Sequence, residues 1–431
     1  MSAAGRVPDL PDDLLAPDAV ADPAGAAALL REHDPVHWSP AHRAWLLTRH
    51  DDVVAAFRDP ALSSDRVRPV LARRQAGQAG QAGQTDGPSA EHRVLSLISD
   101  WMVVSDPPAH TRLRRLAGGA FKQQQIAAMG ERIQTLVDEL VDGFLTTGPA
   151  GDLIADVAYP LPATVIAEML GAPRADRDRF REWSDELALV AFGTGGDARA
   201  DRHARALRGL EEMAAYFRDL VAERRRDPAD DMLSAMIAGE SIGPDVEEGL
   251  TDDELVGMCA LLLFAGHETT TNAIANTVRL LTADPAVRDR VAADPDLVAP
   301  AVEEALRLQG PIKVLVRWVV ADHERRGRRI RAGERVMLVL PGANRDPERF
   351  DRPDALDLHR ERNQHLAFGR GIHACIGAQL ARLETRHAVG TVLRRLPGLR
   401  VTAEPDWIPT IASRAAATLP VTSDVAPAGR R

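Results

Sequence analysis

A helical pattern that runs without interruption from Thr251 to Ala283 constrains the fold more than any other stretch of the sequence. It opens with TDDE, the form of a capping box, in which Thr251 as N-cap and Glu254 three residues later satisfy free backbone N–H groups. It ends where Asp284 precedes a proline, which disfavours a helical conformation in the residue before it. At a rise of about 1.5 Å per residue the helix is about 50 Å long. Because its first half is largely apolar, we expect it to cross the middle of a large domain.

The remaining patterns predict a mainly helical protein with a small β-rich part. Hydrophobic residues make up 45% of the 431 residues, mostly as Ala, Leu and Val, whereas aromatic residues make up only 4%. Ala and Leu favour helices. Strands are few and short: we expect them over 36–48, broken by a turn at Ser39-Pro40, and over 328–340, as a hairpin around Ala332-Gly333. Further helices are expected over 23–33, 51–58, 300–308 and 376–395.

The chain has no linker that would divide it, so residues 23–431 are expected to form one domain. Residues 1–22 are polar and rich in Pro and Asp, and we expect a flexible N-terminal arm there. Residues 75–83 read QAGQAGQAG, and a Gly/Gln tract of this kind cannot bury a hydrophobic core. The low-complexity stretch 75–87 is therefore predicted to be a mobile loop.

The net charge and the number of cysteines limit which kinds of binding partner and which cellular compartment we expect. The net charge of −10 argues against nucleic acid or an anionic membrane surface as the main partner. The two cysteines, Cys259 and Cys375, are too few for a disulfide scaffold and indicate a reducing compartment. The longest apolar run, Leu255 to Gly266, is shorter than the roughly 20 residues that span a bilayer, and residues 1–22 lack the apolar region of a signal peptide. We therefore expect a cytoplasmic, unanchored monomer.

The segment around Cys375, FGRGIHACIG at 368–377, points to metal chemistry. Gly369 and Gly371 permit a tight turn with positive φ, which would bring backbone N–H groups close to the sulfur. Cys375 directly precedes a predicted helix, whose positive dipole end favours a thiolate, and Gly377 lets that helix pack closely against a neighbouring group. A lone cysteine at a helix start is more often a buried structural residue. The surrounding glycines instead favour an anionic sulfur that coordinates a metal.

Halfway along the long helix, AGHETT at 265–270 places polar groups in an apolar stretch. Ala265 and Thr269 are four residues apart and share a helix face. Gly266 costs about 1 kcal/mol relative to Ala in a helix interior, which is understandable if something flat packs against the backbone there. Glu268 and Thr269 suit controlled proton transfer. The alternative is an ordinary glycine kink with the threonine hydroxyl bonded to a backbone carbonyl.

Charged residues at helical spacing mark two more segments. His110 and Arg114 are four residues apart in DPPAHTRLRR (106–115), where the simplest interpretation is a solvated basic helix face. Glu304 and Arg307 are three residues apart, and taken alone they indicate a surface ion pair worth less than about 1 kcal/mol. Arg317 follows ten residues after Arg307.

Taken together, in this order and spacing, these segments resemble the cytochromes P-450. FGRGIHACIG resembles the family's haem-binding loop F-G-x-G-x-H-x-C-x-G, with Arg370 where the commonest bacterial form has His. AGHETT resembles the oxygen-activation motif A-G-x-[DE]-T, EALR at 304–307 resembles E-x-x-R, and DPPAHTRLR resembles D-P-P-x-H-T-x-x-R. The resemblance covers residues 20 to 421. It implies the family fold, a single mainly α domain shaped like a triangular prism with a small β-rich region.

The resemblance also implies a site. Haem b would lie between the long helix and the helix after Cys375, with Cys375 as the thiolate ligand of the iron. Thr269 and Glu268 would be catalytic and deliver protons, whereas Glu304 and Arg307 would form a structural pair. The residues expected to bind the cofactor are His110, Arg114, Ala265, Gly266, Arg317, Phe368, Gly369, His373, Cys375 and Gly377, of which His110, Arg114, Arg317 and His373 would reach the haem propionates.

The implied activity is the insertion of one oxygen atom of O2 into a hydrophobic small molecule, such as a secondary metabolite, by hydroxylation or epoxidation. Because the chain has no flavin or dinucleotide motif, electrons would come from a separate ferredoxin and ferredoxin reductase. A basic patch of Arg112, Arg115, Arg370 and Arg382 would steer an acidic ferredoxin. The substrate pocket is expected to contain few aromatic residues, and Lys313 would either point into it or extend to solvent. Its expected lining is 85–104, 188–197, 262–269, 312–316 and 415–417.

Three alternatives remain open at this point. The haem could serve peroxide-driven chemistry, oxidative coupling or desaturation. The chain could be a non-catalytic haem protein, although the Glu268–Thr269 pair would then have no use. A Cys–His hydrolase built on Cys375 and His373 lacks a third orienting group and leaves the other motifs unexplained.

Overall fold

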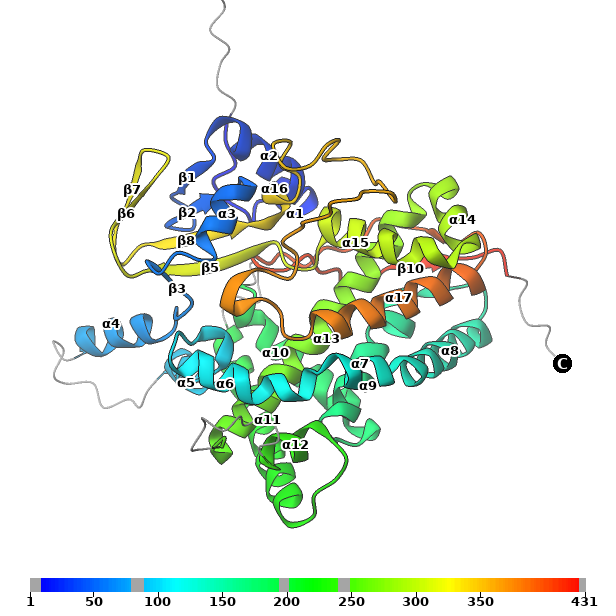
Figure 1. Ribbon diagram of the computed structural model, residues 1–431, viewed down its shortest axis with the longest axis horizontal. Helices are drawn as coiled ribbons and strands as arrows, with labels where there is room; N and C mark the ends of the chain where they lie inside the picture. Colours follow the sequence, from blue (N-terminus) through cyan, green and yellow to red (C-terminus); the bar gives the residue numbers. More distant parts are fainter. Residues whose placement is uncertain (1–8, 79–88, 194–200, 239–248, 426–431) are drawn as a thin grey trace, which may run out of the picture.

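The predicted long helix runs through the middle of the molecule (Figure 1). The structure is a computed structural model that describes residues 9–78, 89–193, 201–238 and 249–425. In it, α13 (Asp252–Thr282) starts with the expected capping box: the Thr251 hydroxyl accepts a hydrogen bond from the Glu254 N–H, and the Glu254 carboxylate accepts one from the Thr251 N–H. Other long helices surround α13, namely α9 (Pro160–Met169), α11 (Arg202–Arg226), α15 (Val298–Gln309) and α17 (Ala378–Arg395).

Helices make up most of the molecule, as the composition predicts. Several fall close to where the sequence pattern placed them, including α2 (Pro23–His33), α3 (His50–Ala56), α15 and α17. The other α-helices of the described chain are α1 (Pro17–Ala21), α2 (Pro23–His33), α3 (His50–Ala56), α4 (Arg68–Gln78), α5 (Ala90–Ile98), α6 (Ala109–Gly118), α7 (Gln123–Ala128), α8 (Gly130–Thr147), α10 (Arg177–Ala191), α12 (Met232–Ala238), α14 (Pro285–Ala293) and α16 (Leu340–Ala343). None of the helices within the described ranges is long and apolar enough to span a membrane.

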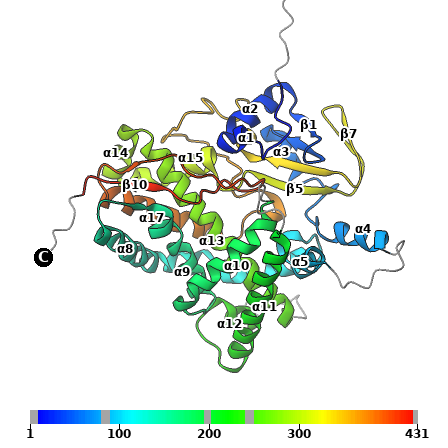
Figure 2. The same cartoon turned by 180° about the vertical axis from the view of Figure 1, so that it is seen from behind.

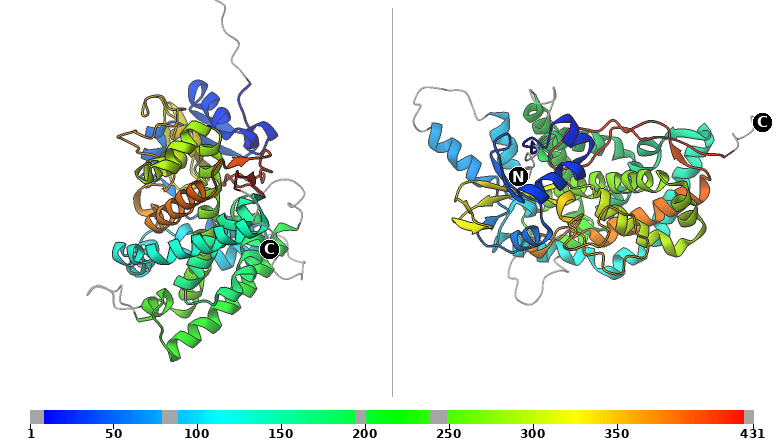
Figure 3. Two further views of the ribbon diagram at one scale, coloured as in Figure 1. Left: turned by 90° about the vertical axis from the view of Figure 1, so that its right-hand side faces the viewer. Right: turned by 90° about the horizontal axis from the view of Figure 1, so that it is seen from above.

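A five-stranded sheet lies at one corner of the molecule in every view (Figures 1, 2 and 3). Its order is β1 (Val36–Ser39), β2 (Ala44–Leu47), β8 (Arg335–Val339), β5 (Val314–Val319) and β3 (Leu62–Ser63). Only β2 and β8 run parallel; the other neighbouring pairs are antiparallel. Smaller sheets join β4 (Ala150–Asp152), β10 (Pro420–Thr422) and β9 (Arg400–Val401), and join β6 (His323–Arg325) with β7 (Arg328–Ile330).

Side chains alternate along each strand, so neighbouring residues point to opposite faces of the five-stranded sheet. Both faces are buried. Leu47, Val336 and Leu338 pack on one face with residues of α3, while Leu46 and Met337 pack on the other with residues of α2. The larger cores lie among the helices on either side of α13. The prediction of a mainly α fold with a small β-rich region is therefore confirmed.

The predicted hairpin over 328–340 is wrong. Arg328–Ile330 pairs with His323–Arg325 across a turn at Arg326-Gly327, whereas Arg335–Val339 is an inner strand that pairs with β5 and β2. The glycine at 333 does adopt a positive φ of 87°, but it marks a bend between two different sheets. The sequence pattern located the strands correctly and could not show that their partners lie elsewhere in the chain.

Two predictions of mobility also need correction. Residues 9–22 are not a loose arm: Leu14, Ala19 and Val20 are buried, and the Arg414 guanidinium donates to the carbonyl oxygens of Val20 and Ala21. The apolar side chains in this polar segment anchor it. Residues 75–78 of the QAG repeat continue α4 instead of forming a loop, whereas 79–87 and 1–8 lie outside the described residues.

Candidate active site

The loop before α17 has the backbone conformation that its glycines predict. Gly369 and Gly371 adopt φ values of 65° and 73°, which residues with a Cβ rarely take. A Cβ at Gly371 would also lie 3.0 Å from the carbonyl oxygen of Phe57. The Cys375 N–H closes the loop by donating to the Phe368 carbonyl at 2.9 Å. These constraints hold Cys375 three residues ahead of the first residue of α17.

Electrostatic effects on the Cys375 sulfur oppose one another. Burial raises the pKa of the thiol above its ordinary value, while a hydrogen bond from the Gly377 N–H and the charges of Arg114 and Arg382 act to lower it. Arg382 is itself held over the Phe368 ring, with its guanidinium carbon 4.3 Å from the ring centre. The sequence-based expectation that the loop alone favours a thiolate is thus only partly met. A bound metal cation would favour the ionised form of the sulfur.

Cys375 opens into a cavity of about 1150 Å³, which also contacts the middle of α13 through Ala265 and Thr269. Much of the lining agrees with the sequence-based prediction, including residues 101–104, 190–193 and 314–316. The prediction for 415–417 is wrong, since Ile411 and Ala412 line the cavity in their place. Aromatic side chains are also more prominent than expected, among them Trp101, Phe192 and Phe264.

Only some residues of the motif at 265–270 in α13 line the cavity. Ala265 and Thr269 line the cavity, as expected from their shared face, and the Thr269 hydroxyl donates to the Ala265 carbonyl at 2.9 Å. Gly266 does not contribute to the cavity: a Cβ there would lie 3.2 Å from Ile166 of α9, so the glycine permits close packing of two helices. Close packing of α13 against α9 is thus one reason for a glycine at this position.

Glu268 is not among the residues that line the cavity, and the charged side chains that act on its carboxylate, Asp185 and Arg181, belong to α10. The Glu268 carboxylate accepts a hydrogen bond from the Asn272 amide at 3.2 Å. Burial, reinforced by the nearby carboxylate of Asp185, raises the pKa of Glu268 to about 7. Asp185 forms an ion pair at 3.7 Å with Arg181, and both of these side chains reach solvent. Glu268 thus lies between the cavity-lining Thr269 and a solvent-exposed pair, with a carboxyl group that can hold a proton at neutral pH.

The histidines expected to bind the cofactor lie together and lack partners. The rings of His110 and His373 are in contact, with 4.0 Å between their centres. Both ring nitrogens of His110 and the Nε2 of His373 are buried without a hydrogen-bond partner in the described part of the chain. Burial, followed by the neighbouring His110 and Arg317, lowers the pKa of His373 to about 3, so the ring is neutral. Buried polar atoms without partners are costly, which indicates a missing acceptor or donor at this position.

Three arginines complete this basic group. Arg114 and His373 line the cavity, and Arg114 donates to the Ala374 carbonyl at 2.6 Å. Burial and the charge of the nearby Arg66 lower the pKa of Arg317 to about 10. Arg66 also lines the cavity and forms no ion pair with any described residue, and no motif in the sequence singled it out. We call His110, Arg114, His373, Arg317 and Arg66 the inner basic group.

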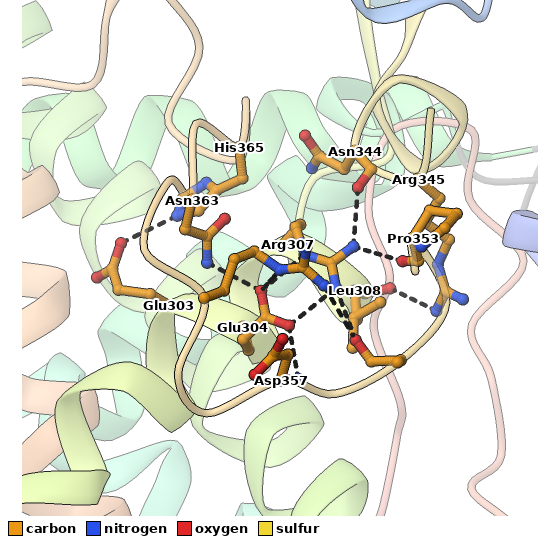
Figure 4. Close-up of polar contacts among 12 residues, drawn as sticks. Glu303, Glu304, Arg307, Leu308, Asn344, Arg345, Pro353, Asp357, Asn363 and His365 are labelled. Carbon is orange, nitrogen blue, oxygen red and sulfur yellow. Dashed lines mark hydrogen bonds and ion pairs between the residues drawn. The ribbon is translucent and has the colours of Figure 1, made fainter. Parts of the chain in front are cut away.

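Glu304 and Arg307 form a buried hub instead of a surface pair (Figure 4). The Arg307 guanidinium binds both oxygens of the Glu304 carboxylate, at 2.7 and 2.9 Å, and donates to the carbonyls of Asn344, Pro353 and Ala355. Burial opposes ionisation of Glu304, but hydrogen bonds from Arg307 and from the Asp357 N–H outweigh it and hold its pKa below the usual value. The hub joins α15 to residues 344–363, the segment that leads into the cysteine loop.

Lys313 lies in neither of the two places considered for it. Its side chain is buried and its ammonium group donates to the Thr410 carbonyl at 2.8 Å. Burial and the charge of Arg414 lower its pKa to about 8. It therefore ties β5 to the segment around Thr410 and does not line the large cavity.

Comparison with known proteins agrees with this arrangement. The family model for cytochrome P-450 matches residues 81–405. The chain belongs to the cytochrome P-450 family. Among its relatives are the vitamin D(3) 25-hydroxylase of Pseudonocardia autotrophica, 39% identical over 88% of this chain and 87% of that protein, and the mycinamicin IV hydroxylase/epoxidase of Micromonospora griseorubida, 36% identical over 88% of this chain and 89% of that protein. The crystal structure of CalO2 is similar with a TM-score of 0.84 and 32% identity, covering 97% of this chain and 99% of that one.

Membership in the P-450 family makes this chain a haem-dependent oxidoreductase, and its residues fit that cofactor. A haem carries two carboxylates on one edge and an iron that requires an axial ligand. The inner basic group supplies charged and unpartnered polar atoms for the carboxylates, and the sulfur of Cys375, which faces the cavity, is a suitable ligand. The carboxylates of a bound haem would give His110 and His373 the partners that they lack.

Proposed function

We propose that this P-450 is a haem-thiolate monooxygenase that holds haem b through Cys375 and inserts one oxygen atom of O2 into a hydrophobic small molecule. The observation that carries the proposal is a cavity in which Cys375, three members of the inner basic group (Arg66, Arg114 and His373) and the Ala265–Thr269 face of α13 meet. The largely apolar lining suits a hydrophobic substrate, such as a secondary metabolite, for hydroxylation or epoxidation. Relatives named as hydroxylases and as an epoxidase support this reaction class.

Each residue of the site has a proposed task. Haem ligated by a thiolate supplies oxygen activation, because the anionic sulfur donates electron density to the iron. Cys375 would provide that ligand, and the inner basic group would orient the cofactor through its carboxylates. The Thr269 hydroxyl would hold and pass a proton inside the cavity. Glu268 would replenish that proton from the side of Asp185 and solvent, since its pKa near 7 suits a proton donor and acceptor at neutral pH.

Electrons for the reaction would come from a ferredoxin and its reductase, but the surface proposed from the sequence needs revision. Arg112 forms an ion pair with Glu254, and Arg382 forms one with Glu303. Only Arg115 and Arg370 of the four arginines lack a carboxylate partner among the described residues. We propose that these two, together with the exposed Ile372 of the cysteine loop, contribute to ferredoxin docking. Charge reversal at Arg115 should then slow reduction by the ferredoxin, most clearly at low ionic strength.

The Thr269→Ala variant should retain haem but lose most of its product. Removal of the hydroxyl interrupts proton delivery, a type of step that typically contributes at least about 100-fold to a rate, so product formed per electron consumed should fall by at least about tenfold. The matched control is Thr270→Ala, which removes an equivalent hydroxyl bonded to the Gly266 carbonyl but buried outside the cavity. Measurement uses a compound that shifts the haem spin state, with a ferredoxin and its reductase as donors. Equal losses in the two variants would contradict the assignment.

Glu268 should give product formation a characteristic pH dependence. Below its pKa of about 7 the carboxyl group carries a proton that it can donate, and above that pH it is ionised. The rate should therefore fall as pH rises through about 7, and this inflection should be absent in Glu268→Gln, which cannot ionise. The check is a pH profile of both proteins at constant ionic strength. An unchanged inflection in the variant would assign it to another group.

A cytoplasmic location is the remaining proposal. Both cysteines are free, Cys259 inside α13 and Cys375 in the cavity, as expected for a protein of a reducing compartment. In a more oxidising compartment, a thiolate that must bind iron would also be at risk of oxidation.

A further inference from the structure

A second set of arginines also lines the cavity. In the sequence these arginines lie well before the cysteine loop. Arg43 follows β1 in the turn to β2, Arg73 lies on α4, and Arg335 begins β8. These elements lie at the same end of the molecule, near β3 and β5 (Figure 1). We call Arg43, Arg73 and Arg335 the outer arginines.

The outer arginines lie close enough to affect one another. Burial, together with the positive charges of Arg43 and Arg73, lowers the pKa of Arg335. Arg335 donates to the His42 carbonyl at 2.6 Å, beside Arg43 in the chain. Arg73 donates to the Gly333 carbonyl at 3.2 Å, two residues before Arg335, and its guanidinium carbon lies 4.7 Å from the centre of the Trp318 ring. Backbone and aromatic contacts thus fix two of these three side chains.

One acidic side chain, Glu334, also lines the cavity beside the outer arginines, but it is not paired with any of them. None of the three arginines forms an ion pair with any residue in the described ranges. The nearest acidic neighbour in the chain, Glu334, is already engaged by the Trp45 indole N–H at 2.7 Å and by the Arg331 N–H at 2.9 Å. Gathering three positive charges costs free energy unless an anion joins them, because like charges repel. This arrangement is therefore complementary to an anionic ligand.

Apolar side chains connect this set with the proposed reaction site. Trp318, Met337 and Val316 lie beside the outer arginines on the sheet and line the same cavity, which continues to Ala265 and Thr269. The inner basic group, by contrast, gathers around His110 and His373. A molecule that reaches from the outer arginines through the apolar part of the cavity to Thr269 would carry its negative charge only at the end beside the outer arginines.

We propose that the outer arginines are a substrate subsite that binds the carboxylate of an amphipathic acid, whose apolar body extends towards Thr269. This inference rests on the proposed function and adds to it the chemical class of the substrate. The carboxylate would accept charge-assisted hydrogen bonds from guanidinium groups, which suit its planar shape. Arg43 is exposed, and it would turn towards the bound anion.

The test compares acids with uncharged partners of the same length. Decanoic, myristic and palmitic acids and the corresponding primary alcohols are titrated into the haem-loaded protein by calorimetry, which does not depend on the haem spectrum. We expect at least one acid to bind about 10- to 100-fold more tightly than its alcohol. Arg43→Gln and the double variant Arg43→Gln/Arg335→Gln should reduce this preference stepwise while leaving alcohol binding unchanged. The control Arg226→Gln removes an exposed arginine at the end of α11, outside the cavity, and should change nothing.

Several results would overturn the proposal. These are equal affinity for acid and alcohol, a parallel loss of both in the Arg43 variant, or no binding of any acid. The carbon monoxide spectrum of the same preparation separates this failure from failure of the proposed function. If that spectrum shows a thiolate-ligated haem while the acids show no preference, only the subsite is wrong.

Discussion

Replacement of Arg307 by alanine is expected to lower the free energy of unfolding by about 3–5 kcal/mol. The arginine is 1% exposed, binds Glu304 through both nitrogens of its fork, and donates to three backbone carbonyls. Its removal leaves Glu304 as a buried carboxylate with a reduced set of donors, and it frees the segment that leads into the cysteine loop. Chemical denaturation followed by circular dichroism measures the change, and haem retention should fall with it.

A matched surface substitution calibrates this expectation. Arg400 pairs with Asp424 at 2.8 Å, but both side chains are more than half exposed. Arg400→Ala should therefore cost less than about 1 kcal/mol. Arg307→Lys adds a second comparison, because it keeps the positive charge but cannot reproduce the fork that binds both carboxylate oxygens. A cost for Arg307→Ala as small as that for Arg400→Ala would mean that the hub does not stabilise the fold.

Substitution of Cys375 by alanine should abolish turnover without unfolding the protein. The side chain lines the cavity, and its sulfur accepts a hydrogen bond from the Gly377 N–H. The variant should therefore lose little packing. Loss of the proposed axial thiolate would remove the electron donation on which oxygen activation depends, and we expect product formation to fall by at least about 1,000-fold, or about 4 kcal/mol of activation free energy. Product analysis and circular dichroism together separate a catalytic effect from unfolding.

The second cysteine of the chain provides the control. Cys259 is fully buried in α13 and packs among apolar side chains of the helical core. Cys259→Ala should leave a small void that costs about 1 kcal/mol and should retain turnover. Comparable loss of activity in both variants would point to general sensitivity of the fold and would remove the special role of Cys375.

Local signals in the sequence explain what could be predicted. The capping box at Thr251 and Glu254 locates the start of α13 because both partners lie within one turn. Gly369 and Gly371 predict positive φ because few other residues tolerate it, and both adopt it. The four motifs, which resemble those of a known family, then predict which residues share a cavity, and Ala265, Thr269 and Cys375 do share one.

Errors arose where the deciding contact lies far away in the chain. The strand Arg335–Val339 has the pattern of a hairpin arm, but its partners are 17 to 25 and 291 residues away. Close packing against Ile166 of another helix is one reason for Gly266, and no local pattern indicates it. Arg66 and the outer arginines occur singly in the sequence, and only the folded chain gathers them around a cavity. Lys313 can be buried because the Thr410 carbonyl, far along the chain, accepts a hydrogen bond from its ammonium group.

The measurement that tests the central claim most directly is the visible spectrum of the purified, dithionite-reduced protein with and without carbon monoxide. The proposed site predicts the long-wavelength Soret band of a haem with a thiolate ligand, and predicts its loss in Cys375→Ala but not in Cys259→Ala. A Soret band at the ordinary position of a haem–carbon monoxide complex in the wild-type protein would mean that the sulfur of Cys375 does not ligate the iron as a thiolate. A folded protein that binds no haem at all would contradict the account of the site as a whole.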